Sequence, residues 1–275
     1  MNAPLQSTPR AHPFFFDADP GTRFCLYHAP SPHMPAHGAI LYVHPFAEEL
    51  NRSRRVVSLQ ARRFAAMGYA VLQIDLFGCG DSCGDFNAAR WDIWKRDLAT
   101  ARAWLADRSA GPMHLWGLRL GALLALDYAA GTHVDGIILW QPFLHGRTCI
   151  NQFLRQGLSF DPDGPHTTAA LRTELLVRGA LEVKGYELAG PLAQAIDACA
   201  ASSLALPPCP VHWFALGAPA PARVTASAAR LAAQWSAGGT RVHFHALDGV
   251  PFWNGDKTDC PGLLEATCAA MTPVS

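Results

Sequence analysis

LWGLRLGA, residues 115–122, joins an apolar run to a run of small residues through a Gly117-x-Arg119-x-Gly121 frame. This frame is typical of a nucleophile elbow, in which a buried strand turns sharply into a helix and holds the central side chain exposed in a strained turn. We expect residues 113–116 to end a buried strand and residues 120–130 to form the helix. The central residue, however, is Arg119, whose guanidinium stays protonated and cannot act as a nucleophile.

The composition is that of a globular chain without a dominant charge. Its 275 residues are 50% hydrophobic, and 22 Lys and Arg balance 22 Asp and Glu, so no net field favours nucleic acid or an anionic membrane. The first residues show no secretory signal, and apolar runs such as 136–140 are too short to span a bilayer. Eight cysteines without metal-ligand spacing predict buried or free thiols in a reducing cytoplasm. We therefore expect a cytoplasmic location, with no metal, cofactor, nucleic-acid partner or membrane insertion.

Short β-rich runs alternate with helical stretches, which predicts a mostly parallel central sheet with helices on both faces. The expected strands are residues 14–17, 23–28, 38–43, 69–76, 113–116, 134–140, 211–216 and 241–247, of which the first two form an antiparallel pair. The expected helices are residues 54–67, 88–107, 120–130, 222–235 and 262–271.

Residues 143–205 interrupt this alternation. They are polar and helical in pieces, with a turn signal at Lys184-Gly185-Tyr186 and a proline-rich return at residues 207–210. An insertion at this point of the chain is expected to lie above the carboxyl ends of the strands, as a cap does. We predict a single domain over residues 1–275 that carries a cap or lid at about 143–205.

The order of elements resembles the α/β-hydrolase superfamily over nearly the whole chain. Three segments are similar, more narrowly, to the second type of hydrolase-like protein associated with the exosortase A system of exopolysaccharide-producing bacteria. They are HPFAEELNRSRR at residues 44–55, DLFGCGDSCGDF at residues 75–86 and GLRLG at residues 117–121. This resemblance implies a bacterial cytoplasmic protein encoded near polysaccharide machinery, whose hydrolase label comes from the fold.

The catalytic residues of the superfamily are missing from their usual positions. Its acid follows the sixth or seventh strand, where this chain has WQP at residues 140–142 and LGAP at residues 216–219. Its histidine follows the last strand, where residues 247–253 are LDGVPFW; no histidine comes after His245, which we expect to pack in the sheet. Loss of the serine or histidine of a triad typically costs about a millionfold in rate. Together with Arg119, these absences argue against the ordinary mechanism.

GDSCG at residues 80–84 also satisfies Gly-x-Ser-x-Gly, but no helix is expected directly after Ser82. We interpret this loop as structural, with Asp81 and Ser82 bonded to local backbone. The alternative is a catalytic Ser82.

The loop after residues 38–43 occupies the position of the oxyanion loop. His44 is interpreted as a hydrogen-bonded structural residue, with a catalytic base as the alternative. Pro45 removes one backbone N–H from this loop, so an oxyanion-type site would use the amides of Phe46 and Leu120.

Arg119 needs a partner if it is buried over the sheet, because an unpaired buried charge is costly. Glu48 and Glu49, placed by the sequence on the loop after His44, or a bound anion could supply it; the alternative is a solvated acidic turn. Candidate ligand-binding residues are Arg119, His44, Glu48, Glu49, Gln141 and Trp253, the last as an aromatic wall.

Two main functions compete. The first is a degenerate hydrolase that binds a small or anionic ligand in a pocket organised by Arg119. The second is an active ester or acyl hydrolase, or an acyltransferase, with a non-standard group such as Ser82, Cys79 or Glu48. A third possibility is that Arg119 orients an anionic substrate while a partner enzyme supplies the chemistry. Proteins of polysaccharide biosynthesis are the expected protein partners.

Overall fold

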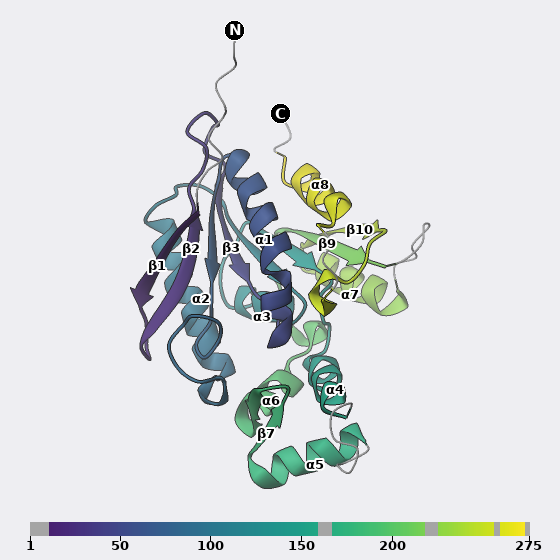
Figure 1. Cartoon of the computed structure of the whole chain (residues 1–275). Coiled ribbons are helices and arrows are strands. Elements are labelled where there is room, and N and C mark those ends of the chain that lie inside the picture. Colours follow the sequence, from purple (N-terminus) through teal and green to yellow (C-terminus); the bar gives the residue numbers. More distant parts are fainter. Residues whose placement is uncertain (1–10, 159–166, 218–224, 256–258, 273–275) are drawn as a thin grey trace.

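A central eight-stranded sheet organises the chain in the computed structural model, which describes residues 11–158, 167–217, 225–255 and 259–272 (Figure 1). The strand order is β1-β2-β4-β3-β5-β6-β9-β10. The bounds are β1 Ala11–Asp17, β2 Thr22–His28, β3 Gly38–Val43, β4 Tyr69–Ile74, β5 Met113–Leu118, β6 Gly136–Trp140, β9 Pro210–Leu216 and β10 Arg241–Leu247. β1 pairs antiparallel with β2 and β2 with β4, while the other neighbours run parallel. The mostly parallel sheet and its leading antiparallel pair are thus confirmed.

Helices cover both faces of the sheet because the central strands are apolar on both sides. Along β3, Leu41 and Val43 pack in the cluster that includes α2 and α3, whereas Ile40 and Tyr42 pack with α1 and α8. The bounds are α1 Glu48–Ala66, α2 Trp91–Ala106, α3 Leu120–Ala129, α7 Ala226–Ala237 and α8 Pro261–Ala270. Each large apolar side chain buried in this way stabilises the fold by about 1.5–3 kcal/mol.

The start of α1 differs from the sequence prediction. The helix begins at Glu48, six residues before the predicted residue 54, so Glu48 and Glu49 form its first turn rather than a loop. The two carboxylates are favourable there because the helix N-terminus carries partial positive charge. Smaller shifts occur elsewhere: a 3-10 turn at Phe86–Ala88 precedes α2, and α7 starts at Ala226 after an N-cap at Thr225, with residues 222–224 of that prediction outside the described part.

Between β6 and β9 the chain forms α4 Gly146–Gly157, α5 Thr168–Arg178, the hairpin β7 Ala180–Val183 and β8 Tyr186–Ala189, and α6 Gly190–Ala198. Figure 1 shows these elements at one end of the molecule, away from the two termini and next to the start of α1. The turn predicted at Lys184-Gly185 is confirmed, since both residues have the positive φ of a tight hairpin turn (50° and 81°).

Candidate functional site

The elbow is present in the expected geometry. Arg119 is the N-cap of α3 with φ 58° and ψ −115°, a conformation that L-residues rarely adopt. A Cβ at Gly117 would overlap the backbone of Ala122, and one at Gly121 would overlap the carbonyl oxygens of Val43 and His44. Both glycines are therefore required by the close approach of strand and helix, and the prediction of a strained Arg119 at this turn is confirmed.

Two further strained residues accompany Arg119. Ala47, the N-cap of α1, has φ 49°, and Gln141, directly after β6, has φ 43°. They follow β3 and β6, which flank β5 in the sheet. Non-glycine residues of this kind cost about 1–3 kcal/mol each and cluster at functional sites. The strain thus marks one edge of the sheet, at three neighbouring strand ends.

The Arg119 guanidinium is held from within the protein. Its side chain is 10% exposed, its Nη2 donates to Gln152 Oε1 on α4 at 2.9 Å, and its Nε and Nη2 each lie 3.4 Å from Glu49 Oε1. The guanidinium carbon stands 4.0 Å from the centre of the Phe143 ring and 5.1 Å from that of Trp253. Of the partners considered from the sequence, Glu49 is the one that pairs with Arg119.

Glu49 is itself a buried carboxylate, with 12% of its side chain exposed. Burial raises its pKa above the ordinary value of 4.5, and the nearby guanidinium groups of Arg119 and Arg52 oppose this rise. Oε1 faces Arg119, but Oε2 is buried and accepts no hydrogen bond from any residue that the structure describes. One carboxylate oxygen of the site is therefore unused.

Glu48 lies on the same helical turn but serves a different purpose. Its carboxylate is 39% exposed, lies 3.2 Å from Arg52 Nε and accepts from the Tyr186 hydroxyl of β8 at 3.4 Å. It therefore links α1 to the hairpin rather than to Arg119.

The His44 ring forms hydrogen bonds to backbone groups. Its Nδ1–H donates to Pro45 O at 2.7 Å, and its Nε2 accepts from the Leu76 N–H at 3.2 Å. Burial lowers the pKa of the ring, so the neutral form is favoured. With both ring nitrogens occupied, this geometry supports the structural interpretation.

The loop that contains Ser82 also uses its polar groups locally. The Ser82 hydroxyl donates to Asp75 O and accepts from the Phe24 N–H at 2.8 Å, which ties β2 to the loop after β4. Cys79 is buried, and burial raises the pKa of its thiol, so a thiolate nucleophile is disfavoured. These contacts support the structural interpretation of residues 80–84.

The positions of the acid and the base hold other side chains. Gln141 Oε1, after β6, accepts from the Leu216 N–H at 2.7 Å and so joins the ends of β6 and β9. Trp253, in the segment after β10, is buried against Arg119. His245 stacks on Phe214 with ring centres 4.3 Å apart, in agreement with the expected packing role. Residues 218 and 219, part of the other acid position, lie outside the described residues.

The two candidate oxyanion donors lie beside a very small space. Phe46 and Leu120 line a cavity of about 10 Å³ together with His44, Pro45 and Cys79. Neither backbone N–H donates a hydrogen bond within the described ranges. In a hydrolase these amides would stabilise the oxyanion that forms when the nucleophile attacks the substrate. Here the residue at the nucleophile position is Arg119.

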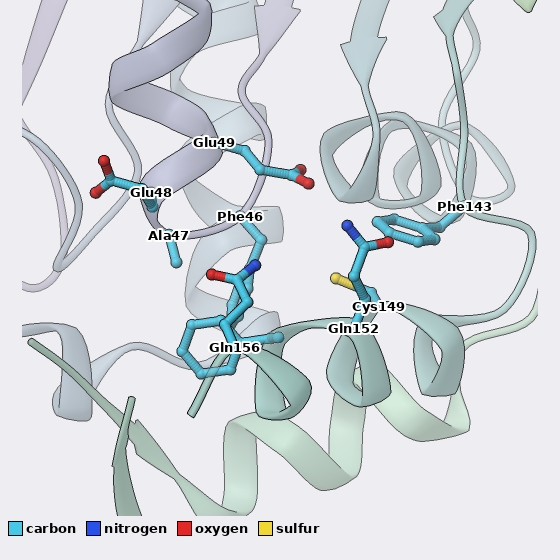
Figure 2. Close-up of a pocket in the computed structure, with 9 residues that line it drawn as sticks. Phe46, Ala47, Glu48, Glu49, Phe143, Cys149, Gln152 and Gln156 are labelled. Atoms are coloured by element: carbon cyan, nitrogen blue, oxygen red, sulfur yellow. The ribbon is translucent and has the colours of Figure 1, made fainter. Parts of the chain in front are cut away.

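A second cavity lies between α1 and α4 and has a volume of about 20 Å³, which suffices for a water molecule. Figure 2 shows the Glu49 carboxylate and the Gln152 amide turned toward the same space, whereas Glu48 points away. The lining residues are Phe46, Ala47, Glu48, Glu49, Phe143, Cys149, Gln152, Phe153 and Gln156. Neither Arg119, His44, Gln141 nor Trp253 belongs to this lining, although the sequence grouped them with the glutamates.

The residues that α4 contributes were missed at the sequence level. Cys149, Gln152, Phe153 and Gln156 project from a helix within an irregular insertion, and no motif or spacing connects them to the elbow. Their periodicity of three and four does place them on one helical face, but not against a particular neighbour.

The described parts of the chain lack a metal-binding cluster and a membrane-spanning helix. They contain no group of three or more His, Cys, Asp and Glu side chains placed to hold a metal ion. No helix there has both the length and the apolar character needed to cross a membrane.

Comparison with known proteins gives a family and a fold. The model of a hydrolase family described as serine aminopeptidase, S33, matches residues 34–234. None of the curated proteins compared with the chain matches it. Among solved structures, Est1E from Butyrivibrio proteoclasticus with bound ferulic acid is 17% identical with a TM-score of 0.64, covering 94% of this chain and 96% of that one.

Two further structures give the same fold. A carboxyl esterase from Bacillus coagulans in complex with glycerol is 14% identical with a TM-score of 0.64, covering 95% of this chain and 97% of that one. Alpha/beta hydrolase domain-containing protein 10 from mouse is 14% identical with a TM-score of 0.59, covering 95% and 98%. The α/β-hydrolase fold expected from the sequence is thus confirmed.

Proposed function

Because the chain belongs to the serine aminopeptidase S33 family of hydrolases yet carries Arg119 at the nucleophile position, we propose that it binds a small molecule without hydrolysing it. The observation that carries this proposal is the internal engagement of Arg119. Its guanidinium bonds to Glu49 and Gln152 and faces two aromatic rings, so the centre of the elbow offers neither a nucleophile nor a base.

The cap belongs to the proposal. We take residues 143–205 as a cap on a single domain that spans residues 1–275, and its helix α4 as the wall opposite α1. The contacts of Gln152 with Arg119 and of Tyr186 with Glu48 support this division, since both join the inserted elements to the carboxyl edge of the sheet.

An anionic ligand is a second candidate, favoured by one observation. The distances from Arg119 to Glu49 are 3.4 Å, longer than is usual for a charge-assisted hydrogen bond. A carboxylate or phosphate could therefore displace Glu49 and take its place on the guanidinium.

The biological setting is a separate part of the proposal. The similarity of residues 44–55, 75–86 and 117–121 to exosortase-associated proteins supports a cytoplasmic role beside exopolysaccharide synthesis, with proteins of that machinery as partners. Such a protein could present its ligand to a partner enzyme that performs the chemistry.

The test is direct. Purified protein is incubated with a fluorophosphonate probe, which labels activated serines, and with p-nitrophenyl acetate and butyrate. We expect neither labelling nor turnover. Turnover that persists after careful purification and disappears in Ser82→Ala would overturn the proposal and assign the chemistry to the loop at residues 80–84. Ser202→Ala, at an exposed serine in the 3-10 turn Ala201–Ser203, is the matched control.

A further inference from the structure

We propose that the cavity between α1 and α4 binds the hydroxyl group of a neutral ligand, with Glu49 Oε2 as acceptor and the Gln152 amide as donor. This inference rests on the proposed function, because it names the class of small molecule that the site would hold. It differs from the anionic alternative in the charge of the ligand.

Arg119 determines which atom of the Gln152 amide remains available to a ligand. A guanidinium only donates, so Gln152 must turn its oxygen toward Arg119, and its Nε2 amide hydrogens then face elsewhere. Glu49 Oε2 is buried and accepts no hydrogen bond from the residues that the structure describes. The contact found for the Gln152 amide among those residues is the one from Arg119 to its oxygen, which leaves Nε2 available to a ligand. The side chains point into the same space in Figure 2. The cavity thus presents one unused acceptor beside one available donor.

A hydroxyl group matches this pair because it donates and accepts at once. A carboxylate accepts only and would meet Glu49 as a like charge, whereas an ammonium donates only and would leave the Gln152 amide unsatisfied. The size agrees with the same assignment, since a cavity of about 20 Å³ admits a group no larger than a water molecule or a hydroxyl.

The charges around the cavity also favour a neutral ligand. Glu49 is paired with Arg119 and Glu48 with Arg52, so each carboxylate in the lining already has a cationic partner. An ion that entered would add an uncompensated charge to a poorly solvated site, while a neutral ligand would not.

Buried aromatic side chains form much of the remaining lining of the cavity. Phe46, Phe143 and Phe153 line the cavity, and the Phe46 and Phe153 rings meet edge to face with centres 5.1 Å apart. Gln156 adds a half-buried amide to the lining. Because the cavity has room for a hydroxyl-sized group and is partly open, the hydroxyl head of the ligand would enter it and the apolar body would lie outside, across its mouth.

The experiment compares three probes of similar shape at neutral pH by ligand-observed NMR and titration calorimetry. The probes are benzyl alcohol, the cation benzylamine and the anion benzoate. We expect benzyl alcohol to bind about tenfold more tightly than either ion. Equal or tighter binding of benzoate or benzylamine overturns the inference, and so does failure of benzyl alcohol to bind, which would leave the cavity as a water site.

Two variants locate the binding. Glu49→Gln keeps the shape but removes the charged acceptor, so the affinity for benzyl alcohol should fall about tenfold. If that variant fails to fold, Gln156→Trp fills the half-buried lining position and should abolish binding. Its matched control, Gln234→Trp on the exposed surface of α7, should leave binding unchanged. Unchanged affinity in Gln156→Trp overturns the assignment to this cavity.

The result of the probe-binding experiment can be told apart from the result of the ester assay that tests the proposed function. Ester turnover by the wild-type protein overturns the non-hydrolytic role whichever probe binds. Preference for benzoate overturns only the neutral hydroxyl ligand and leaves a binding protein whose ligand is anionic.

Discussion

At position 119 a guanidinium occupies the point at which this fold normally exposes a nucleophile. The elbow keeps its strain, with φ 58° at Arg119, although no attacking group benefits from it. Here the strained turn directs the Arg119 guanidinium toward Glu49, Gln152 and two aromatic rings. The side chain at the elbow is therefore part of the packing between α1, α3 and α4, and its replacement has structural as well as chemical consequences.

Arg119→Ser should not create a hydrolase. The new hydroxyl would have no histidine beside it, because Trp253 occupies the corresponding position after β10. The variant should also lose about 3 kcal/mol of stability, since Glu49 remains buried without its partner. Urea denaturation and the ester assay measure the two effects. Adding Glu49→Gln should restore part of the stability; turnover in the single variant would contradict this view of the site.

The buried carboxylate predicts a pH dependence of stability. Because the folded-state pKa of Glu49 is raised, the folded protein binds this proton more strongly, and stability falls as pH rises from the ordinary value of 4.5 through the folded value. The titratable groups around Glu49 are Arg119, Arg52, the Cys149 thiol and the Tyr42 hydroxyl, and burial keeps the last two neutral. In Glu49→Gln this part of the slope should disappear. Chemical denaturation over a pH series tests it, and identical slopes would contradict the assignment.

At the scale of elements, the site is defined by helices that begin at the carboxyl ends of strands. α1 and α3 both start at a strained residue, Ala47 and Arg119, and α3 approaches β3 so closely that only glycine fits at position 121. α4 closes the opposite side through Gln152 and Phe153. The cavity lies where α1 and α4 meet at this edge of the sheet, beside the start of α3.

Gly121→Ala tests the closeness of that packing. The added methyl would collide with the carbonyl oxygens of Val43 and His44, so we expect a loss of about 1–3 kcal/mol. Gly262→Ala in α8 is the matched control, because a Cβ there meets nothing within 4 Å. That substitution should stabilise the protein by about 0.5–1 kcal/mol through helix propensity. Thermal or urea unfolding distinguishes the expected loss of stability from the expected gain. Unchanged stability in Gly121→Ala would refute the requirement for glycine at position 121.

At the scale of the whole molecule, the inserted elements hold together through a polar network of their own. Arg172 on α5 bonds to Asn151 on α4 at 2.7 Å and pairs with Asp197 on α6. The side chains of the ion pair are 18% and 25% exposed, so solvent screens them only in part. This network makes the helices of the insertion one unit that contacts the elbow through α4.

Arg172→Met should loosen the insertion without unfolding the sheet. We expect faster amide hydrogen exchange in α4–α6 and unchanged exchange in β3–β6, as local opening of a separate unit predicts. Arg178→Met on the same helix removes an ion pair whose arginine is 70% exposed and should change stability by less than about 0.5 kcal/mol. Equal effects of the two variants, or increased exchange in the sheet, would contradict this division.

The sequence by itself determined the alternation of strands and helices, the elbow with its required glycines, and the loss of the nucleophile. These follow from local pattern and residue chemistry, because periodicity specifies an element and Arg119 cannot attack under any packing. Only the tertiary structure decided that Glu49 rather than Glu48 pairs with Arg119, that α4 supplies Gln152, and that Trp253 faces the guanidinium. Those contacts join residues up to 134 positions apart, and no local signal encodes which side of a helix meets which strand end. Glu48 and Glu49 show this clearly, since neighbouring residues on one helical turn point in different directions and only packing selects the buried one.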